Sequence, residues 1–263
     1  MKVFINPNMS KNIHLGNFNN LASAYRKSRP SYSKEIINLI KSLSRQNRNK
    51  ITSLELGSGT GIFTKQISKI SQKVIGIELS KEMIANAHKI KNVKYINASA
   101  DNVKIHSKFD FIFAASCFHW FDNRKISSLV KINLKKNGFF LICYNSRDIS
   151  RSSFLKSVEK KIFSLSKKFK SRVSSGQSAF VKNKVMDFSK ISKLNGPLYF
   201  EFNHFEKFSS KRYLTAWESS NEFRSKLGQR NFLIFMEWLK KNFPKNGITA
   251  KYTNKCWLLQ KLF

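Results

Sequence analysis

Cysteine is scarce in this chain of 263 residues, which contains only Cys117, Cys143 and Cys256. Three scattered cysteines are too few for the disulfide framework of a small secreted domain, and they lack the paired spacing of a structural zinc site. They are typical of a protein kept in a reducing compartment. The sequence therefore predicts no disulfide framework and no metal site.

Long apolar runs are absent as well. The most apolar stretch, residues 109–121, contains Asp110 and His119 and is shorter than the roughly 20 residues that a membrane-spanning helix needs. Residues 1–15 hold no apolar block of the length found in signal peptides. From these two absences we predict a soluble, cytoplasmic protein with no membrane span.

Acidic residues are also few. The chain has 15 Asp and Glu against 49 Lys and Arg, which gives a formal net charge of +34. Such a charge can indicate a polyanionic partner, above all a nucleic acid. The lysines, however, are spread from Lys2 to Lys261, and the whole chain is rich in Lys, Asn, Ile, Ser and Phe, as A·T-rich codon usage would produce. Compositional bias is therefore the favoured interpretation, and a nucleic-acid partner stays open as the second.

Hydrophobic residues make up 41% of the chain and aromatic residues 13%, which is enough for a folded core. From residue 51 onward, apolar segments with strand and helix periodicity alternate. Strands are predicted over residues 51–56, 74–78, 93–98, 109–115 and 138–144, and helices over 62–70, after Ser80 and over 126–134. This alternation predicts an α/β fold with a mostly parallel sheet and helices on both faces.

The flanking segments are less regular. Residues 1–31 are predicted to form an irregular arm, and a helix is predicted from its N-cap Ser33 to Arg45. Further helices are predicted over 153–169 and 232–243 and strands over 199–208 and at the end of 248–262, while 171–196 give no clear pattern. We expect one domain, divided into an N-terminal arm and helix (1–50), a core (51–145), a cap or insert (146–198) and C-terminal strands and helix (199–263).

The sharpest local signal is LELGSGTG, residues 54–61, between a predicted strand and a predicted helix. Glycines let a ligand approach the backbone closely, and the start of a helix offers free N–H groups. The spacing is not the G-x-G-x-x-G of dinucleotide sites, because position 62 is Ile, and no Gly-Lys-Ser/Thr of a P-loop follows. Glu78 ends the next strand about 20 residues further on, where a carboxylate can accept hydrogen bonds from ribose hydroxyls; its alternative role is to stabilise the helix that starts at Ser80. The two features predict a site for an adenosyl group without a pyrophosphate.

These segments resemble motifs of the class I S-adenosylmethionine-dependent methyltransferases. LELGSGTG is similar to their first motif, and GIELSKEMI, residues 76–84, is similar to their second. The resemblance implies a Rossmann-like, seven-stranded, mostly parallel sheet with a small helical cap, and S-adenosyl-L-methionine as the cofactor. It also implies that the glycines pack against the methionine and ribose portions, that Glu78 holds the ribose hydroxyls and that Leu79 lies against the adenine.

A third segment, NASADN at residues 97–102, resembles the family's small-Ala-acid segment, in which Asp101 would face the adenine amino group although Glu is commoner there. Ser116 follows the fourth strand, where the sulfonium of the cofactor usually lies in this family. The cofactor-binding residues that the resemblance implies are Glu55, Gly57, Ser58, Gly59, Gly61, Glu78, Leu79, Ala100, Asp101 and Ser116.

Two further segments resemble small-molecule methyltransferases of the trans-aconitate and ubiquinone-biosynthesis type. They are Y-x-x-x-R-P-x-Y from Tyr25 to Tyr32 and SCFHWFD at residues 116–122. Tyr25 and Arg29 could bind the carboxylate of the cofactor or an acidic substrate, and Trp120 could wall the acceptor pocket. The alternatives are a structural clamp for Arg29 and a packing role for Trp120.

Methyl transfer from a sulfonium depends on positioning and a dry pocket, and it requires no metal. A hydroxyl or a carbon acid as acceptor needs a base, whereas a carboxylate needs none. His119 is the candidate base because it follows a strand end that faces the cofactor, and packing is its alternative role. Cys117 is not favoured as a nucleophile, because no Pro-Cys signature surrounds it.

The sequence thus predicts methyl transfer to a small-molecule acceptor, by O- or C-methylation and with carboxylates among the acceptors. Methylation of tRNA or rRNA is the alternative that the charge suggests, although the fourth strand does not end in the Asn/Asp-Pro-Pro-Tyr/Phe expected for exocyclic amines. A non-catalytic adenosyl-binding protein is the third interpretation. The sequence does not assign an oligomeric state.

Overall fold

The fold is built on one seven-stranded sheet with the order β3-β2-β1-β4-β5-β7-β6. This computed structural model describes residues 21–44, 51–166, 169 and 179–262. The strands are β1 (Thr52–Leu56), β2 (Lys73–Glu78), β3 (Val93–Asn97), β4 (Phe109–Ala115), β5 (Leu134–Asp148), β6 (Asn195–Phe208) and β7 (Ile248–Gln260). The first five strands run parallel, and β7 pairs antiparallel with both β5 and β6. The predicted fold class, a mostly parallel α/β sheet, is confirmed.

Helices cover both faces of this sheet because the strand residues alternate between the two faces. In β4, Phe111 and Phe113 pack in the cluster that contains α2 (Lys34–Leu43) and α3 (Ile62–Ile67). Ile112 and Ala114 belong to the opposite cluster, which contains α5 (Asn123–Asn133) and α7 (Ala179–Ser192). The strand is therefore buried on both sides, as its continuous apolar sequence predicts.

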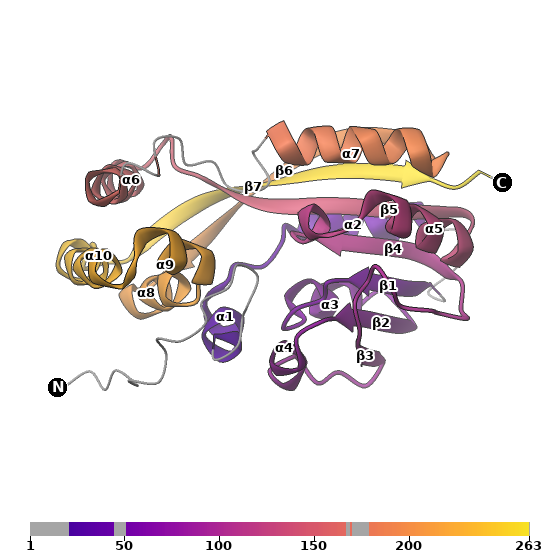
Figure 1. Cartoon of the computed structure of the whole chain (residues 1–263), viewed down its shortest axis with the longest axis horizontal. Coiled ribbons are helices and arrows are strands. Elements are labelled where there is room, and N and C mark those ends of the chain that lie inside the picture. The colour runs from indigo at the N-terminus through magenta and orange to yellow at the C-terminus, as the bar shows by residue number, and fades with distance from the viewer. Residues whose placement is uncertain (1–20, 45–50, 167–168, 170–178, 263) are drawn as a thin grey trace.

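The last three strands are longer than the parallel core, and they extend beyond it to a second helical cluster (Figure 1). The pairing of β4 with β5 ends at Ala115 and Cys143, whereas β5 and β7 stay paired as far as Asp148 and Lys251. The extension leads to α6 (Ser153–Leu165), α8 (Ser210–Glu218), α9 (Asn221–Leu227) and α10 (Gln229–Asn242). We call these four helices the cap.

The cap has an aromatic core of its own. Trp217 on α8 packs edge-to-face against Phe235 on α10, with ring centroids 4.9 Å apart, and lies 4.7 Å from Phe223 on α9. Such contacts add to the stabilisation from burial of the rings. The cap is thus a packed unit that can hold side chains in fixed positions opposite the parallel strands.

Three parts of the secondary structure differ from the prediction. The irregular arm predicted over residues 1–31 is wrong at Ala22–Ser28, which form α1, a short helix that buries only Ala22 and Ser28 and packs against α8. Helix α7 forms within 171–196, where no element was predicted, and it covers the sheet, whereas α6 belongs to the cap. Helices α8 and α9 were not predicted. Residues 1–20 and the predicted loop at 45–50 lie outside the described residues.

The described residues were also searched for membrane-spanning helices, metal sites and disulfides. Across the residues that the structure describes, no helix is long and apolar enough to cross a membrane. In the same residues, no group of three or more His, Cys, Asp or Glu side chains could hold a metal ion. The three cysteines are buried and free.

Candidate functional site

The glycine loop joins β1 to α3, and its three glycines all have positive φ, from +56° to +78°. A side chain at Gly57 would bring its Cβ within 2.9 Å of Cys117, and one at Gly61 would collide with Tyr95. At Gly59, by contrast, no atom lies within 4 Å of the place that a Cβ would occupy. Packing therefore requires the outer two glycines, whereas Gly59 presents bare backbone to open space.

Glu78 meets this loop directly, as the sequence predicts. Strands β1 and β2 pair in register up to Leu56 and Ile77, so that their carboxyl ends lie side by side. One carboxylate oxygen of Glu78 accepts a hydrogen bond from the Gly59 N–H at 2.8 Å, and the other accepts from the Ser80 N–H at 2.8 Å. Leu79, the next residue, is 72% exposed at the rim of this junction.

Asp101 and Ala100 lie on the segment between β3 and β4. The Asp101 carboxylate accepts a hydrogen bond from the Asp122 N–H at 3.0 Å, and Asp122 in turn caps the N-terminus of α5. Ala100 is buried in the core on the α5 side of the sheet. Asp101 therefore ties the segment after β3 to the loop after β4.

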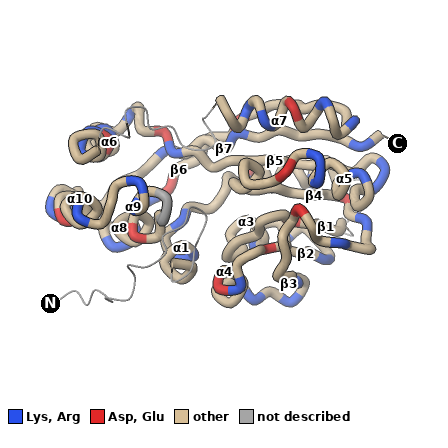
Figure 2. Tube along the Cα trace, viewed as in Figure 1, with Lys and Arg blue, Asp and Glu red and all other residues tan. Residues whose placement is uncertain are grey.

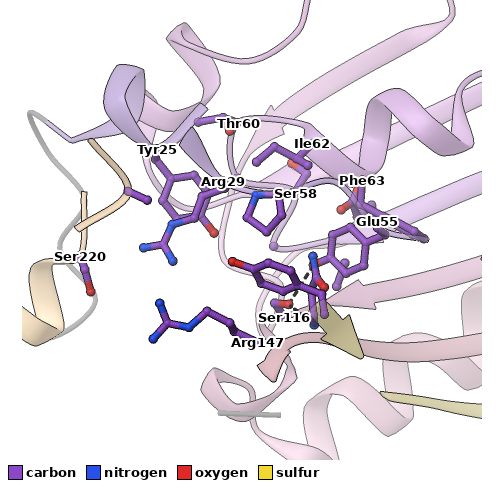
Figure 3. Close-up of a pocket in the computed structure, with 18 of the residues that line it drawn as sticks. Tyr25, Arg29, Glu55, Ser58, Thr60, Ile62, Phe63, Ser116, Arg147 and Ser220 are labelled. Carbon is purple, nitrogen blue, oxygen red and sulfur yellow. Dashed lines mark hydrogen bonds between the residues drawn. The ribbon is translucent and has the colours of Figure 1, made fainter. Parts of the chain in front are cut away.

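A cavity of about 370 Å³ separates the glycine loop and the end of β4 from the cap. Figure 3 shows the labelled side chains that surround it. Nine of the residues singled out from the sequence line it: Tyr25, Arg29, Glu55, Gly57, Ser58, Gly59, Ser116, His119 and Trp120. Gly61, Glu78, Leu79, Ala100 and Asp101 are not among the residues that line it. The structure thus brings the loop, the end of β4 and the N-terminal motif together, and it leaves Gly61 and the segments 78–79 and 100–101 beside or behind the cavity.

The far wall of the cavity was missed from the sequence. It is formed by residues of β5, β6, β7 and α8: Asn145, Arg147, Phe208, Tyr213, Ala216, Trp217 and Tyr252. These residues come from segments that are far apart in the chain. Trp217 and Tyr252 lie in C-terminal segments that resemble bacterial methyltransferases, but neither residue was predicted to line the site.

The N-terminal motif reaches the cavity because several hydrogen bonds hold it. Ser31 donates from its hydroxyl to Glu206 on β6 at 2.7 Å, and the Ser33 N–H donates to the Asn254 side chain on β7 at 2.7 Å. The hydroxyls of Tyr32 and Ser116 are 2.8 Å apart. Residues 29–33 are therefore a strap that closes one side of the cavity.

Glu55 is an unusual carboxyl group at the base of the cavity. It is 1% exposed, and the Thr64 hydroxyl donates a hydrogen bond to it at 2.5 Å. Burial raises the pKa of Glu55 to about 8, and the nearby charge of Glu78 contributes to the rise. The group is therefore largely neutral at pH 7, and a cation bound close to it would favour its ionised form.

His119 is held by Tyr144, a buried residue on β5. The backbone N–H of His119 donates to the Tyr144 hydroxyl at 2.9 Å, and the ring Nδ1 lies 3.0 Å from the same oxygen. Lys184 on α7 donates to the backbone carbonyls of His119 and Phe121. The ring of the neighbouring Trp120 is tilted against the His119 ring, with centroids 4.7 Å apart, and Trp120 is half exposed.

Two arginines point to the same side of the cavity (Figure 3). The guanidinium of Arg29 lies over the Tyr25 ring at 4.7 Å, and its Nε is buried without a hydrogen-bond partner among the described residues. Arg147 donates to the Tyr213 hydroxyl at 2.8 Å and to the Glu159 carboxylate at 2.9 Å. Arg147 is thus neutralised by a partner, whereas Arg29 brings positive charge into the cavity.

The comparisons with known proteins agree with this geometry. Residues 54–142, which include the glycine loop, Glu78 and Ser116, match the model of a family described as a methyltransferase domain. The chain carries a class I S-adenosylmethionine-dependent methyltransferase domain. A candidate methyltransferase of Dictyostelium discoideum is 32% identical to this chain over 126 residues, which are 48% of this chain and 47% of that protein. The chain spans about half the length of the curated relatives that it matches first.

Two other similarities cover more of this chain. A malonyl-[acyl-carrier protein] O-methyltransferase of Bacillus cytotoxicus is 24% identical over 216 residues, 76% of this chain and 73% of that protein. The solved structure of a candidate type II methyltransferase from Anaeromyxobacter dehalogenans superposes with a TM-score of 0.60 at 14% identity, over 89% of this chain and 98% of that one. The second likeness concerns the fold alone.

The residues of the cavity fit the cofactor of this family. The hydroxyls of Ser58 and Thr60 are buried without hydrogen-bond partners in the part of the chain that the structure describes, and both line the cavity. Gly59 leaves room against its backbone, and Glu78 holds a carboxylate where the loop meets β2. A buried polar group without a partner is costly, so these hydroxyls are suited to receive polar groups of a ligand.

Proposed function

We propose that this chain transfers a methyl group from S-adenosyl-L-methionine to a small-molecule acceptor, by O- or C-methylation, with carboxylates among the acceptors. The observation that carries the proposal is the cavity, which has the glycine loop and Ser116 on one wall and the aromatic residues of the cap on the other. Its size lies in the range that is typical of sites for small molecules.

The chain's own residues supply position and electrostatics. The cofactor, when bound, supplies a methyl group on a positively charged sulfur, which is already activated for displacement. Gly57, Gly59 and Ser116 would contact the cofactor, and Glu78 would accept hydrogen bonds from its ribose hydroxyls. The carboxyl group of Glu55, which lies under the loop, can ionise to balance the charge of the sulfonium. The cap side chains that line the cavity would limit the access of water to the reacting atoms.

Arg29 supports an acidic ligand. Its guanidinium faces the cavity beside Tyr25, and the buried Nε has no partner among the described residues. A carboxylate in the cavity would satisfy this group with charge-assisted hydrogen bonds. The carboxylate can belong to the methionine portion of the cofactor or to the acceptor. An acidic acceptor is also consistent with the name of the Bacillus cytotoxicus relative, which methylates a malonyl group by that name.

Methylation of RNA is the second candidate, and the net charge of +34 favours it. Figure 2 shows, however, that Lys and Arg are distributed over helices, strands and loops all around the described chain. Nucleic-acid-binding proteins usually gather such residues on one face. The distribution therefore favours a small-molecule acceptor.

One labelling experiment compares the two candidates. Purified protein is incubated with donor that carries a labelled methyl group, in parallel with a metabolite extract and with total RNA from the same cells. We expect label in the low-molecular-weight fraction and none in RNA above a control without protein. Label confined to RNA would replace the proposed acceptor class, and the absence of label from both samples would count against the activity.

A further inference from the structure

An ion pair outside the cavity lies against the segment that carries Arg29. The carboxylate of Glu206 on β6 and the guanidinium of Arg212 on α8 are 2.9 Å apart, and their side chains are 15% and 28% exposed. Arg212 also donates to the Lys207 carbonyl at 2.8 Å, and its guanidinium lies 4.5 Å from the centroid of the Phe208 ring. Neither member of the pair lines the cavity. Because their charges balance, an effect of the pair on a bound ligand has to pass through the residues that it contacts.

The pair contacts the backbone on both sides of the Arg29 side chain. Arg212 donates from Nε to the Ser28 carbonyl at 3.3 Å and from Nη2 to the Arg29 carbonyl at 3.4 Å. The second carboxylate oxygen of Glu206 accepts from the Ser31 N–H at 3.2 Å and from the Ser31 hydroxyl at 2.7 Å. The guanidinium thus binds the carbonyls of residues 28 and 29, and the carboxylate binds the N–H of residue 31.

The chain before the strap has little apolar surface that could fix its position. Helix α1, which ends at Ser28, buries only Ala22 and Ser28, and both are small residues. The far end of the strap is held by Tyr32 and Ser33, through Ser116 and the Asn254 side chain. The end at Arg29 is held by the Glu206–Arg212 pair. Polar contacts, rather than burial, therefore fix where the Arg29 backbone lies.

Arg29 is the side chain that this backbone directs into the cavity. Its guanidinium lies over the ring of Tyr25, one helical turn earlier, at 4.7 Å, and its Nε is buried without a hydrogen-bond partner among the described residues. Figure 3 shows it on the same side as Arg147, which is already paired with Glu159. A guanidinium binds a carboxylate through a planar fork of N–H donors, so the strength of this contact depends on its orientation.

We propose that Glu206 and Arg212 form a latch that positions Arg29 to bind the carboxylate of a ligand. The inference rests on the proposed function and deepens it. Glu206 and Arg212 are positioning residues, because they act on the ligand through the backbone of residues 28–31 and through the Arg29 side chain. The carboxylate belongs either to the methionine portion of the cofactor or to the acceptor, and the experiments distinguish these two sources.

The first measurement identifies the ligand that Arg29 binds. Calorimetry gives the affinity for S-adenosylhomocysteine. The dilution of metabolite extract that half-saturates labelling, with labelled donor at saturation, gives an apparent KM for the acceptor. Arg29→Ala should weaken the ligand that carries the carboxylate by at least about tenfold, from the usual strength of a hydrogen bond to a charged group. A loss for S-adenosylhomocysteine assigns the carboxylate to the cofactor, and a loss for the extract assigns it to the acceptor. No loss for either would overturn the inference.

A double-mutant cycle then tests whether the latch acts through Arg29. Arg212→Ala should weaken the same ligand by at least about threefold, and in the Arg29→Ala background it should change the affinity by less than about twofold, because residues that act as one unit are not additive. A pair that only stabilised the fold would not show this dependence on Arg29. Losses that multiply, or an unchanged affinity in Arg212→Ala alone, would overturn the latch.

Two further variants separate positioning from stability. Glu206→Gln keeps the shape of the side chain but removes its charge, and its cycle with Arg29→Ala should show the same dependence even if Arg212→Ala does not fold. Lys255→Ala removes a different ion pair of β6, with Glu201 at 3.6 Å, and it should leave both affinities within about twofold of the wild type. Denaturant titration confirms that each variant is folded. A loss in Lys255→Ala equal to that in Arg212→Ala would overturn the latch.

Failure of this inference can be told apart from failure of the proposed function. A wild-type protein that binds S-adenosylhomocysteine and labels the extract, but whose variants show additive losses, would overturn the latch alone. A wild-type protein that neither binds S-adenosylhomocysteine nor labels the extract would overturn the proposed function, and the latch with it.

Discussion

The two walls of the cavity are built in different ways. The cofactor wall comes from short, contiguous segments: residues 57–60 supply most of the loop, and Ser116 supplies the end of β4. The wall on the cap side is assembled from residues that are far apart in the chain, from Asn145 on β5 to Tyr252 on β7. From this contrast we expect the donor site to be encoded locally and the recognition of the acceptor to depend on how the cap packs on the long strands.

The largest effect is expected from a side chain placed on the cofactor wall. Gly59→Arg would fill the open space beside the backbone and should weaken S-adenosylhomocysteine binding by at least a hundredfold, measured by calorimetry. Gly228 provides a matched control, because it also has positive φ (+79°) and no atom within 4 Å of the place that a Cβ would occupy, but lies in the cap away from the cavity lining. Gly228→Arg should bind the ligand as the wild type does. Equal losses in the two variants would show that backbone strain, and not the cofactor wall, is responsible.

The next largest effect is expected from a substitution on the cap side of the cavity. Trp217→Ala removes a side chain that packs on Phe223 and Phe235 and should lower the free energy of unfolding by about 3–5 kcal/mol. Denaturant titration measures the loss, and Trp238→Ala, at a half-buried position of α10, should cost clearly less. Under native conditions Trp217→Ala should still bind S-adenosylhomocysteine within about threefold of the wild type while turnover falls. A matching loss of affinity would mean that the two walls are not separable.

A smaller effect involves the protonation of Glu55. Its pKa of about 8 lies above that of the unfolded chain, so folding favours the neutral form. Stability from this group is complete below the unfolded pKa and falls by about 1.4 kcal/mol per pH unit as the pH rises towards 8. Glu55→Gln should remove this slope from the free energy of unfolding. An unchanged slope would show that Glu55 is already ionised in the folded protein.

The same carboxyl group should couple cofactor binding to proton release. A bound sulfonium favours the ionised form of Glu55, so the affinity for S-adenosylmethionine should rise with pH up to about 8 and then level off. Calorimetry in two buffers with different ionisation enthalpies measures the released proton. S-adenosylhomocysteine, whose sulfur is neutral, should give a weaker effect, and Glu55→Gln should give none.

The smallest effect is expected at Leu79, which is 72% exposed. Leu79→Ala should change the free energy of unfolding by less than about 0.5 kcal/mol, as exposed substitutions usually do. If Leu79 covers the adenine, its truncation removes buried apolar surface worth about 1 kcal/mol of binding free energy and should weaken cofactor binding by roughly fivefold. Ile132→Ala, at another exposed apolar position on α5, is the control and should leave binding unchanged.

The sequence predicted the wall that is built from contiguous segments better than the wall that is built from distant ones. The alternation of apolar strands and helices predicted the sheet, because a strand such as β4 is buried on both faces and its sequence shows it directly. The junction of the glycine loop with Glu78 was predicted because parallel neighbours end at the same edge. Whether the individual cofactor residues play their expected roles stays a prediction.

Other features could not be predicted from sequence. Helix α1 has seven residues and almost no apolar stripe, and it is stabilised by docking on α8 rather than by its own pattern. The contact of Tyr144 with His119 joins residues on separate elements through a hydroxyl. Such contacts depend on the register of β5 against β4. Strand β5 is also longer at both ends than the apolar run from which it was predicted.

A crystal structure with S-adenosylhomocysteine tests the central claim most directly, namely that the ends of β1, β2 and β4 form one cofactor site. We predict electron density for the ligand along Gly57–Gly59, with its ribose hydroxyls on Glu78 and its sulfur beside Ser116. Density at any other surface, or a ligand whose ribose lies away from Glu78, would contradict the account.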